Sequence, residues 1–92
     1  MNRNYYLNFN NVVKKSLLAP LDGHKSFYGK CCEMIYKNGD IALFSYDTLI
    51  LVKNTAGKYR RFWGSWSATT GRHVRAFNGF NKKDYEALSV ED

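Results

Sequence analysis

Residues suited to binding phosphate, carboxylates or bases gather in the stretch from Arg60 to Phe77. It holds two tryptophans, several hydroxyls, one histidine and four arginines. Guanidinium groups bind anions through paired N–H donors, and tryptophan rings stack on the bases of single strands. The stretch is therefore either a surface that binds phosphate or a partner, or a strand that leads into a helix and closes a core.

A helix that starts after Ser67 would add an anion-binding feature, because its first amides are free and its dipole favours negative charge. Capping alone also explains Ser67 and the threonines that follow it. The tryptophans could equally anchor a core or an interface. We expect the binding contacts to come from Arg60, Arg61, Trp63, Trp66, Thr69, Thr70, Arg72, His73, Arg75, Lys82 and Lys83.

Positive charge is concentrated in the C-terminal half of the chain. The formal net charge is +6, and no aspartate or glutamate occurs between Thr48 and Lys83. Such a segment should attract phosphate or an acidic protein surface, although a solvated basic surface also aids solubility. We expect a continuous electropositive surface, shaped by the tryptophans and the start of the helix, to be the working surface.

Side chains that could perform catalysis do not occur at catalytic spacings. The chain has no G-x-S-x-G elbow, glycine-rich phosphate loop or paired-carboxylate motif. The histidine at position 73 is expected to be packed, with one ring nitrogen hydrogen-bonded. We therefore expect a non-enzymatic protein without catalytic residues. A hydrolase triad could be assembled only by ignoring the spacing of Ser45, Asp47, Ser65, Ser67 and His73.

The cysteines and histidines form no metal-binding pattern. Cys31 and Cys32 are adjacent, and on a strand their side chains would point to opposite faces, which is poor geometry for a disulfide. A zinc site needs a second pair of ligands at matching spacing, and His24 and His73 are the only histidines. We expect reduced thiols, no metal and no cofactor.

Length and composition indicate one small globular domain. The 92 residues are 45% hydrophobic and 16% aromatic, which is enough apolar surface for one modest core. No apolar run approaches the roughly 20 residues that cross a bilayer. Residues 1–7 lack the apolar region of a signal peptide. We expect a cytoplasmic protein that has no membrane partner.

A short helix is predicted within the N-terminal segment, residues 1–24. Its apolar face would be formed by Val12, Val13 and Leu17, after an asparagine cap at position 10 or 11. The proline at position 20 and the Asp-Gly pair that follows would end the helix in a turn. The pattern in residues 1–9 predicts no particular element.

Residues 25–64 are predicted to form antiparallel strands. The run SFYGKCCEMIY at 26–36 is rich in β-forming residues, and the following Asn38-Gly39 pair favours a two-residue hairpin. The return strand at 41–46 is apolar on both faces, which indicates a central position. Two more strands, joined by a loop at 54–57, are expected at 49–53 and 58–64.

The last of these strands has the pattern of an edge strand. Its residues alternate, so that Tyr59, Arg61 and Trp63 face one way. The basic and aromatic side chains at positions 58, 60 and 62 face the other way. Basic side chains on both faces are more easily accommodated at the edge of a sheet than at its centre.

Residues 65–92 are predicted to form two helices and a tail. Ser67 caps a helix over 68–78 that ends at Gly79 in the left-handed conformation. Its buried face would carry Thr70, Val74 and Phe77. A capping box between positions 81 and 84 starts a second helix over 82–88, and the acidic end of the chain is expected to fray.

These elements predict an α+β fold. An antiparallel sheet of three to five strands would be packed, on one face, with an N-terminal helix and two C-terminal helices. The whole chain, residues 1–92, would form one domain.

Three segments follow one another in a specific order: KSFYGK at 25–30, SYDT at 45–48 and WSATTGRH at 66–73. Together they resemble an uncharacterised family of small phage and mobile-element proteins of Gram-positive bacteria. The likeness covers about residues 25–88, whereas Cys31, Cys32 and the first 20 residues look individual to this chain. The resemblance implies a phage setting in a host cytoplasm and no particular mechanism.

That setting favours a protein that acts stoichiometrically. The leading hypothesis is an inhibitor of a host defence nucleoprotein, similar in role to anti-CRISPR proteins, that grips its target through the basic, aromatic surface. The alternative is an accessory protein that binds DNA or RNA with the same face. A homodimer through an exposed strand edge stays open.

Overall fold

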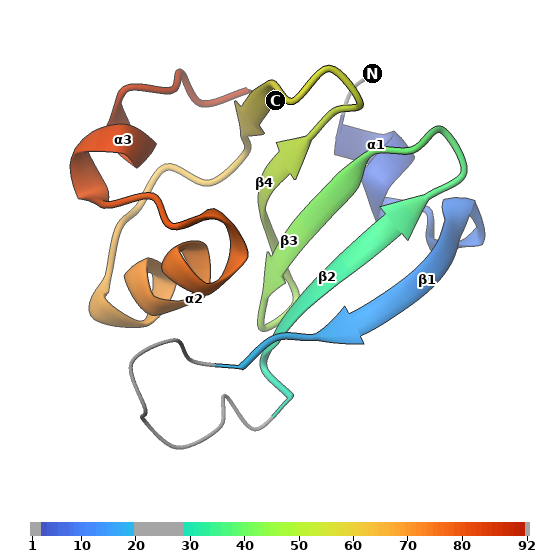
Figure 1. Ribbon diagram of the computed structural model, residues 1–92, viewed down its shortest axis with the longest axis horizontal. Coiled ribbons are helices and arrows are strands. Elements are labelled where there is room, and N and C mark those ends of the chain that lie inside the picture. The colour runs from blue at the N-terminus through green and yellow to red at the C-terminus, as the bar shows by residue number, and fades with distance from the viewer. Residues whose placement is uncertain (1–2, 20–28, 92) are drawn as a thin grey trace.

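The computed structural model describes residues 3–19 and 29–91 and shows an antiparallel five-stranded sheet with helices on both sides (Figure 1). The α+β class is confirmed, and the sheet is a simple meander in which sequential strands are neighbours. The strands are β1 (Val12–Leu17), β2 (Cys31–Tyr36), β3 (Ile41–Ser45), β4 (Thr48–Lys53) and β5 (Tyr59–Arg61). The helices are α1 (Arg3–Leu7), the 3-10 turn η1 (Phe9–Asn11), α2 (Ala68–Asn78) and α3 (Lys82–Glu86).

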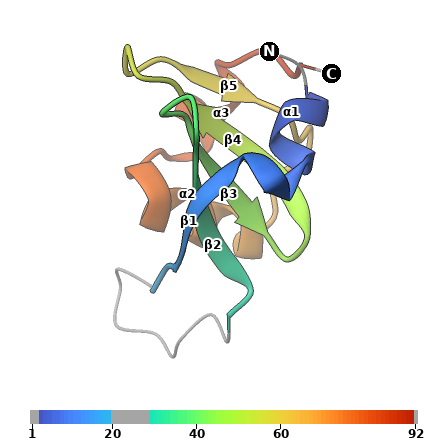
Figure 2. The same cartoon turned by 90° about the vertical axis from the view of Figure 1, so that its right-hand side faces the viewer.

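The two faces of the sheet are covered by different ends of the chain. α1 and η1 lie on one side, while α2 and α3 lie on the other (Figures 1 and 2). The α1-side core is built around Tyr6, Phe44 and Phe62, and the α2/α3-side core around Val74 and Tyr85. The prediction that all helices share one face is therefore wrong for α1. Because the central strands are apolar on both faces, each face needs a cover.

A bulge in β4 adjusts which side chains reach each core. Leu43 pairs with Leu51 while its neighbour Phe44 pairs with Leu49, so Ile50 is the extra residue. Ile50 and Leu51 both enter the α2/α3-side core, whereas Leu49 lies in the α1-side core.

The predicted helix around Val12 and Leu17 is wrong, because this segment forms β1. β1 pairs with β2 along its length. Its valines are β-branched, and a short apolar pattern fits a strand as well as a helix, so pairing with β2 decides the outcome. The N-terminal helix is α1 instead, in residues for which the sequence pattern predicted nothing. The predicted turn at positions 20–23 and the strand residues 26–28 lie outside the described residues.

Of the three hairpins that connect β2 to β5, those after β2 and β4 lie at the predicted turns, whereas β3 and β4 meet at Tyr46 and Asp47, and Tyr46, expected in the strand, has φ 57°. Between β2 and β3, the Gly39 amide donates to the Tyr36 carbonyl at 2.9 Å, and Gly39 has φ 91°. The hairpin is confirmed, although its loop includes Lys37 and is longer than two residues. Between β4 and β5, the Asn54 side chain accepts hydrogen bonds from the amides of Ala56, in the predicted loop, and Lys58, directly after it.

The outer edges of the sheet differ in their protection. β5 is covered by the C-terminal tail, because the Glu91 amide donates to the Arg61 carbonyl at 2.7 Å and Val90 bridges Arg61. The expectation that this end frays is wrong for Glu91. The outer edge of β1 has no strand partner among residues 3–19 and 29–91. In the same part of the chain, no helix has the length and apolar character needed to span a membrane.

A buried hydrogen-bond network holds α1 on the sheet. The Tyr6 hydroxyl donates to the Asp40 carboxylate at 2.6 Å, and the Tyr36 hydroxyl donates to the Tyr6 carbonyl at 2.7 Å. Burial, followed by the bond to Asp40, raises the pKa of Tyr6, so its phenol keeps its proton and acts as donor. The rings of Tyr6 and Tyr36 also meet edge to face.

Replacing Tyr6 by phenylalanine should destabilise the fold, because the Asp40 carboxylate loses a buried donor. We expect the free energy of unfolding to fall by about 1–3 kcal/mol, measured by urea denaturation. Tyr46→Phe is the matched control, since Tyr46 is 57% exposed. Equal stability of the two variants would contradict the structural role of the Tyr6–Asp40 bond.

Candidate functional site

A buried serine–histidine pair lies where α2 packs on the end of β3. Ser45 Oγ and His73 Nδ1 are 2.6 Å apart, and both residues are buried. Desolvation, with a smaller contribution from the Arg72 charge, lowers the pKa of His73. The imidazole is therefore neutral near pH 7, and it is packed and hydrogen-bonded as the sequence predicted.

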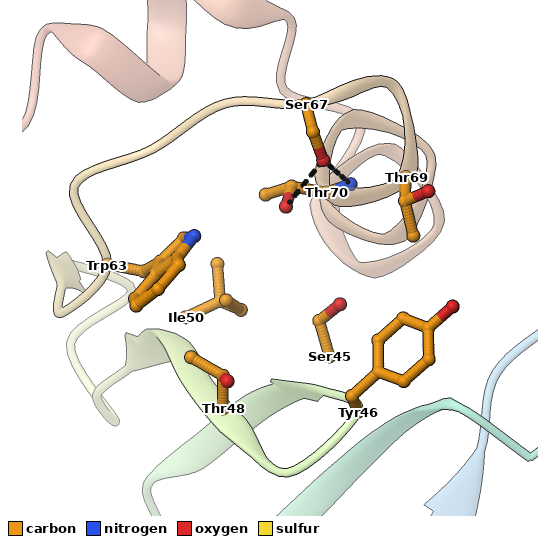
Figure 3. A pocket seen from close by; sticks show the side chains of 8 residues that line it. All are labelled: Ser45, Tyr46, Thr48, Ile50, Trp63, Ser67, Thr69 and Thr70. Carbon is orange, nitrogen blue, oxygen red and sulfur yellow. Dashed lines mark hydrogen bonds between the residues drawn. The ribbon is translucent and has the colours of Figure 1, made fainter.

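A pocket of about 300 Å³ opens beside this pair, and its lining is rich in hydroxyl groups (Figure 3). It lies between the β3–β4 turn and the start of α2, with the Trp63 indole at one side (Figure 3). Ser45 connects the pocket to His73. The lining residues are Ser45, Tyr46, Thr48, Ile50, Trp63, Ser67, Thr69 and Thr70.

The start of α2 uses most of its polar groups internally. The Ser67 side chain accepts a hydrogen bond from the Thr70 amide at 3.0 Å and also contacts the Thr70 hydroxyl at 3.2 Å. The predicted cap at Ser67 and the left-handed end at Gly79 are both confirmed. Thr70 is buried. Capping thus accounts for Ser67 and Thr70. Thr69 also lines the pocket and does not contribute to this cap.

Arg61 is buried and belongs to the scaffold. Its guanidinium donates to three carbonyls at 2.9–3.0 Å, those of Trp63, Gly64 and Leu88. It also lies over the Tyr85 ring, 4.3 Å from the centroid. A guanidinium with these bonds is not offered to a partner, so Arg61 leaves the set of exposed candidates.

Arg60 points to the opposite face of β5, as strand alternation predicted. Its side chain forms an ion pair with Glu91 at 3.0 Å and stacks over the Phe62 ring. It is half-buried on the side that carries α1. The continuous electropositive surface expected from the sequence is therefore interrupted, because Arg60 and Arg61 do not join the arginines of α2.

The two tryptophans have different environments. Trp66 is half-buried and packs against Tyr85, and a Cβ added at Gly71 would come within 2.7 Å of its ring. This close approach explains the glycine inside α2. Trp63 is 40% exposed and lines two hollows, the hydroxyl-rich pocket and a second one of about 240 Å³ next to α1. Trp63 is thus the indole that a ligand could reach.

Four cations remain exposed on the two C-terminal helices: Arg72, Arg75, Lys82 and Lys83. We refer to them as the helical cations. The rings of Tyr59, Phe77 and Phe80 dock the end of α2 and the start of α3 against β5. Lys82 and Lys83 follow directly on the confirmed Asn81 cap. The sequence found these four residues from their charge and helical spacing.

The two cysteine side chains point to opposite faces of the sheet. Cys31 and Cys32 are buried free thiols in opposite cores. Burial raises the pKa of the Cys31 thiol to about 12. Within residues 3–19 and 29–91, no three histidine, cysteine or carboxylate side chains could hold a metal ion together.

The sequence missed the partner of His73 and the role of Arg61. Ser45 and His73 are 28 positions apart, and Arg61 and Leu88 are 27 apart. No local pattern connects residues at such separations. The alternation along β5 was the available signal for Arg61, since it places this side chain opposite to Arg60, on the face that α2 and α3 cover.

Arg61→Lys should destabilise the protein although the charge is kept. An ammonium group cannot reproduce the planar fork that reaches three carbonyls, and unfilled buried acceptors cost energy. We expect a loss of about 2–3 kcal/mol in the free energy of unfolding, measured by urea denaturation. Arg72→Lys, on the exposed face of α2, is the control and should behave as wild type.

His73 should titrate below the ordinary histidine pKa of about 6.5. Since the unfolded chain then binds the proton more tightly, the stability from neutral His73 is present above about pH 6.5 and is lost as the pH falls below it. NMR of the imidazole nitrogens measures the midpoint directly. A midpoint at or above about 6.5 would contradict the assignment of a desolvated, neutral ring.

Residues 16–90 match the model of a family of unknown function, DUF8033, and the chain belongs to that family. No curated protein and no solved structure matches the chain.

Proposed function

We propose that this DUF8033 protein is a small, non-enzymatic binding protein that acts stoichiometrically as an inhibitor of a host defence nucleoprotein. Its target-binding surface consists of the helical cations on α2 and α3. This surface binds an acidic protein surface of the target. The resemblance of three segments to phage and mobile-element proteins supports the setting, because such proteins commonly act on components of the host cell.

The observation that carries the proposal is the exposure of the helical cations, which outnumber the acidic residues of their two helices. α2 contains no acidic residue, and α3 carries Asp84 and Glu86 after its two lysines, so an excess of positive charge remains. Complementary charge accelerates encounter and selects partners more than it adds affinity. Lys82 also occupies the first position of α3, where the helix dipole disfavours a cation. Fold stability therefore does not explain its placement.

The packing of the aromatic rings favours a protein target over single-stranded nucleic acid. Single-strand binding proteins offer several open rings on which successive bases stack. Trp66 is half-buried here, and the rings of Tyr6, Tyr36, Phe62 and Tyr85 are buried in the two cores. The open rings among the described residues are Trp63, Tyr46 and Phe9, and none of them lies on α2 or α3, which carry the cations.

A nucleic-acid-binding accessory protein is the second candidate. The same cations would contact phosphates. The exposed Trp63 beside the hydroxyl-rich pocket supports this alternative, because its ring offers a place for one base to stack. Such binding releases counterions, so it weakens steeply as salt rises.

Capture from a host lysate with the tagged full chain, followed by mass spectrometry, tests the proposal. We expect one host protein complex to be retained at salt concentrations that remove bare RNA and DNA. Reversing the helical cations (Arg72→Glu/Arg75→Glu and Lys82→Glu/Lys83→Glu) should weaken that complex about tenfold or more per pair. Purified protein titrated with labelled RNA and duplex DNA at rising salt provides the second arm.

Lys37→Glu/Lys53→Glu is the matched control, since both lysines are exposed and the net charge changes equally. Equal loss of binding in the control pair would show that net charge alone acts, and would overturn the assignment to α2 and α3. Tight, salt-sensitive binding to bare nucleic acid without a retained protein would favour the accessory role instead.

A further inference from the structure

A second surface lies on the α1 side of the sheet at its β1 edge, on the opposite face from the helices that carry the helical cations. Here a groove of about 330 Å³ runs along β1 and the η1 turn. We refer to it as the β1 groove. Its lining residues are Phe9, Val12, Val13, Lys14, Lys15 and Met34.

The β1 groove exposes large apolar side chains that the fold leaves uncovered. Phe9 is 56% exposed and Val13 is 61% exposed, and Leu17, farther along β1, is 64% exposed. The short helix α1 covers the part of this face where Tyr6 packs on Tyr36, so its cover ends before the groove. Neighbouring exposed apolar side chains of this size mark interaction sites more often than single ones do.

The backbone of β1 offers an edge to which an extended chain can pair. β1 bonds to β2 on one side, and on its other side no strand lies among the residues that the structure describes. A bulge between Val12 and Lys14 places Val13 out of register with β2. An extended segment that adds to such an edge gains main-chain hydrogen bonds and presents alternate side chains to a neighbouring groove.

The charges around the groove select between possible occupants. Residues 3–19 contain three cations, Arg3, Lys14 and Lys15, and no acidic residue. Lys14 and Lys15 are both exposed. A second copy of the chain paired at the same edge would bring these lysines against their own counterparts, which like charges disfavour. A segment with carboxylates beside its apolar residues would be attracted instead.

The residues that form the β1 groove lie mostly outside the segment that matches the family model. The match covers residues 16–90. Apart from Met34, every residue that lines the β1 groove lies before position 16. These residues precede the matched segment and lie beside Met34 of β2, which is within it.

We propose that the β1 groove is a binding site for an extended, acidic and apolar segment of a partner protein. The segment adds along the edge of β1 that faces away from β2, places an apolar side chain against Phe9, Val13 and Met34, and sets carboxylates near Lys14 and Lys15. The site does not depend on the helical cations, and it stands whether those contact protein or nucleic acid.

Fluorescence polarisation with a labelled synthetic peptide that alternates glutamate with valine and phenylalanine tests this site. We expect binding to the full chain, with amide shifts in two-dimensional NMR spectra concentrated at residues 12–17. The same peptide with lysine for every glutamate should not bind. Lys14→Glu/Lys15→Glu should weaken the acidic peptide about tenfold or more, and Val13→Ser should weaken it without any change of charge.

Lys82→Glu/Lys83→Glu is the matched control and should change the affinity less than about twofold, while it should impair capture of the host complex. Circular dichroism of each variant confirms that the exposed substitutions leave the fold intact. Failure of the peptide to bind, equal weakening by both lysine pairs, or shifts confined to α2 and α3 would overturn the proposal. So would a dimer in sedimentation velocity whose formation shifts the amides of residues 12–17, because a second copy would then be the occupant.

Discussion

The buried guanidinium of Arg61 is the contact on which the arrangement of the C-terminal half depends. β5 is short, and the chain after it must reach the face covered by α2 and α3 without further strand pairing to guide it. Arg61 fixes this path through the carbonyls of Trp63 and Gly64, and it holds the end of the chain through Leu88. A buried charge is stable only when its donors are satisfied. The three carbonyls and the Tyr85 ring therefore take up their positions around Arg61 together as the protein folds.

The position of α2 follows from that path, and with it the polar features near its start. Ser67 can cap the helix only where that path ends, and Ser45 can meet His73 only if the helix lies over the end of β3. The same placement turns Arg72 and Arg75 outward. One scaffold arginine thus decides where the remaining cations can act.

The sheet is apolar on both faces, but the two covers are unequal. α2 is eleven residues long and buries its face together with α3, whereas α1 has five residues. The Tyr6–Asp40 bond holds α1 over one end of its face of the sheet. The part of that face beside β1 is left uncovered, so it keeps exposed apolar side chains. The molecule consequently presents a cationic surface on one side and a mixed apolar and cationic groove on the other.

Local patterns in the sequence determined the elements whose causes are themselves local. The Ser67 cap, the Gly79 end, the Asn81–Asp84 capping box and the alternation along β5 each depend on residues a few positions apart. Composition and spacing also determined the free cysteines on opposite faces and the basic segment between Thr48 and Lys83 that contains no acidic residue.

Tertiary structure alone decided which of those residues are available to a partner. The segment at 12–17 became a strand because β2 offered it a pairing edge, and α1 went to the far face because the central strands left that face open. Arg61 and His73 are not available to a partner, because their side chains are bonded to residues 27 and 28 positions away. Burial is a property of the assembled fold, so charge and spacing along the chain could name the basic residues but could not separate scaffold from surface.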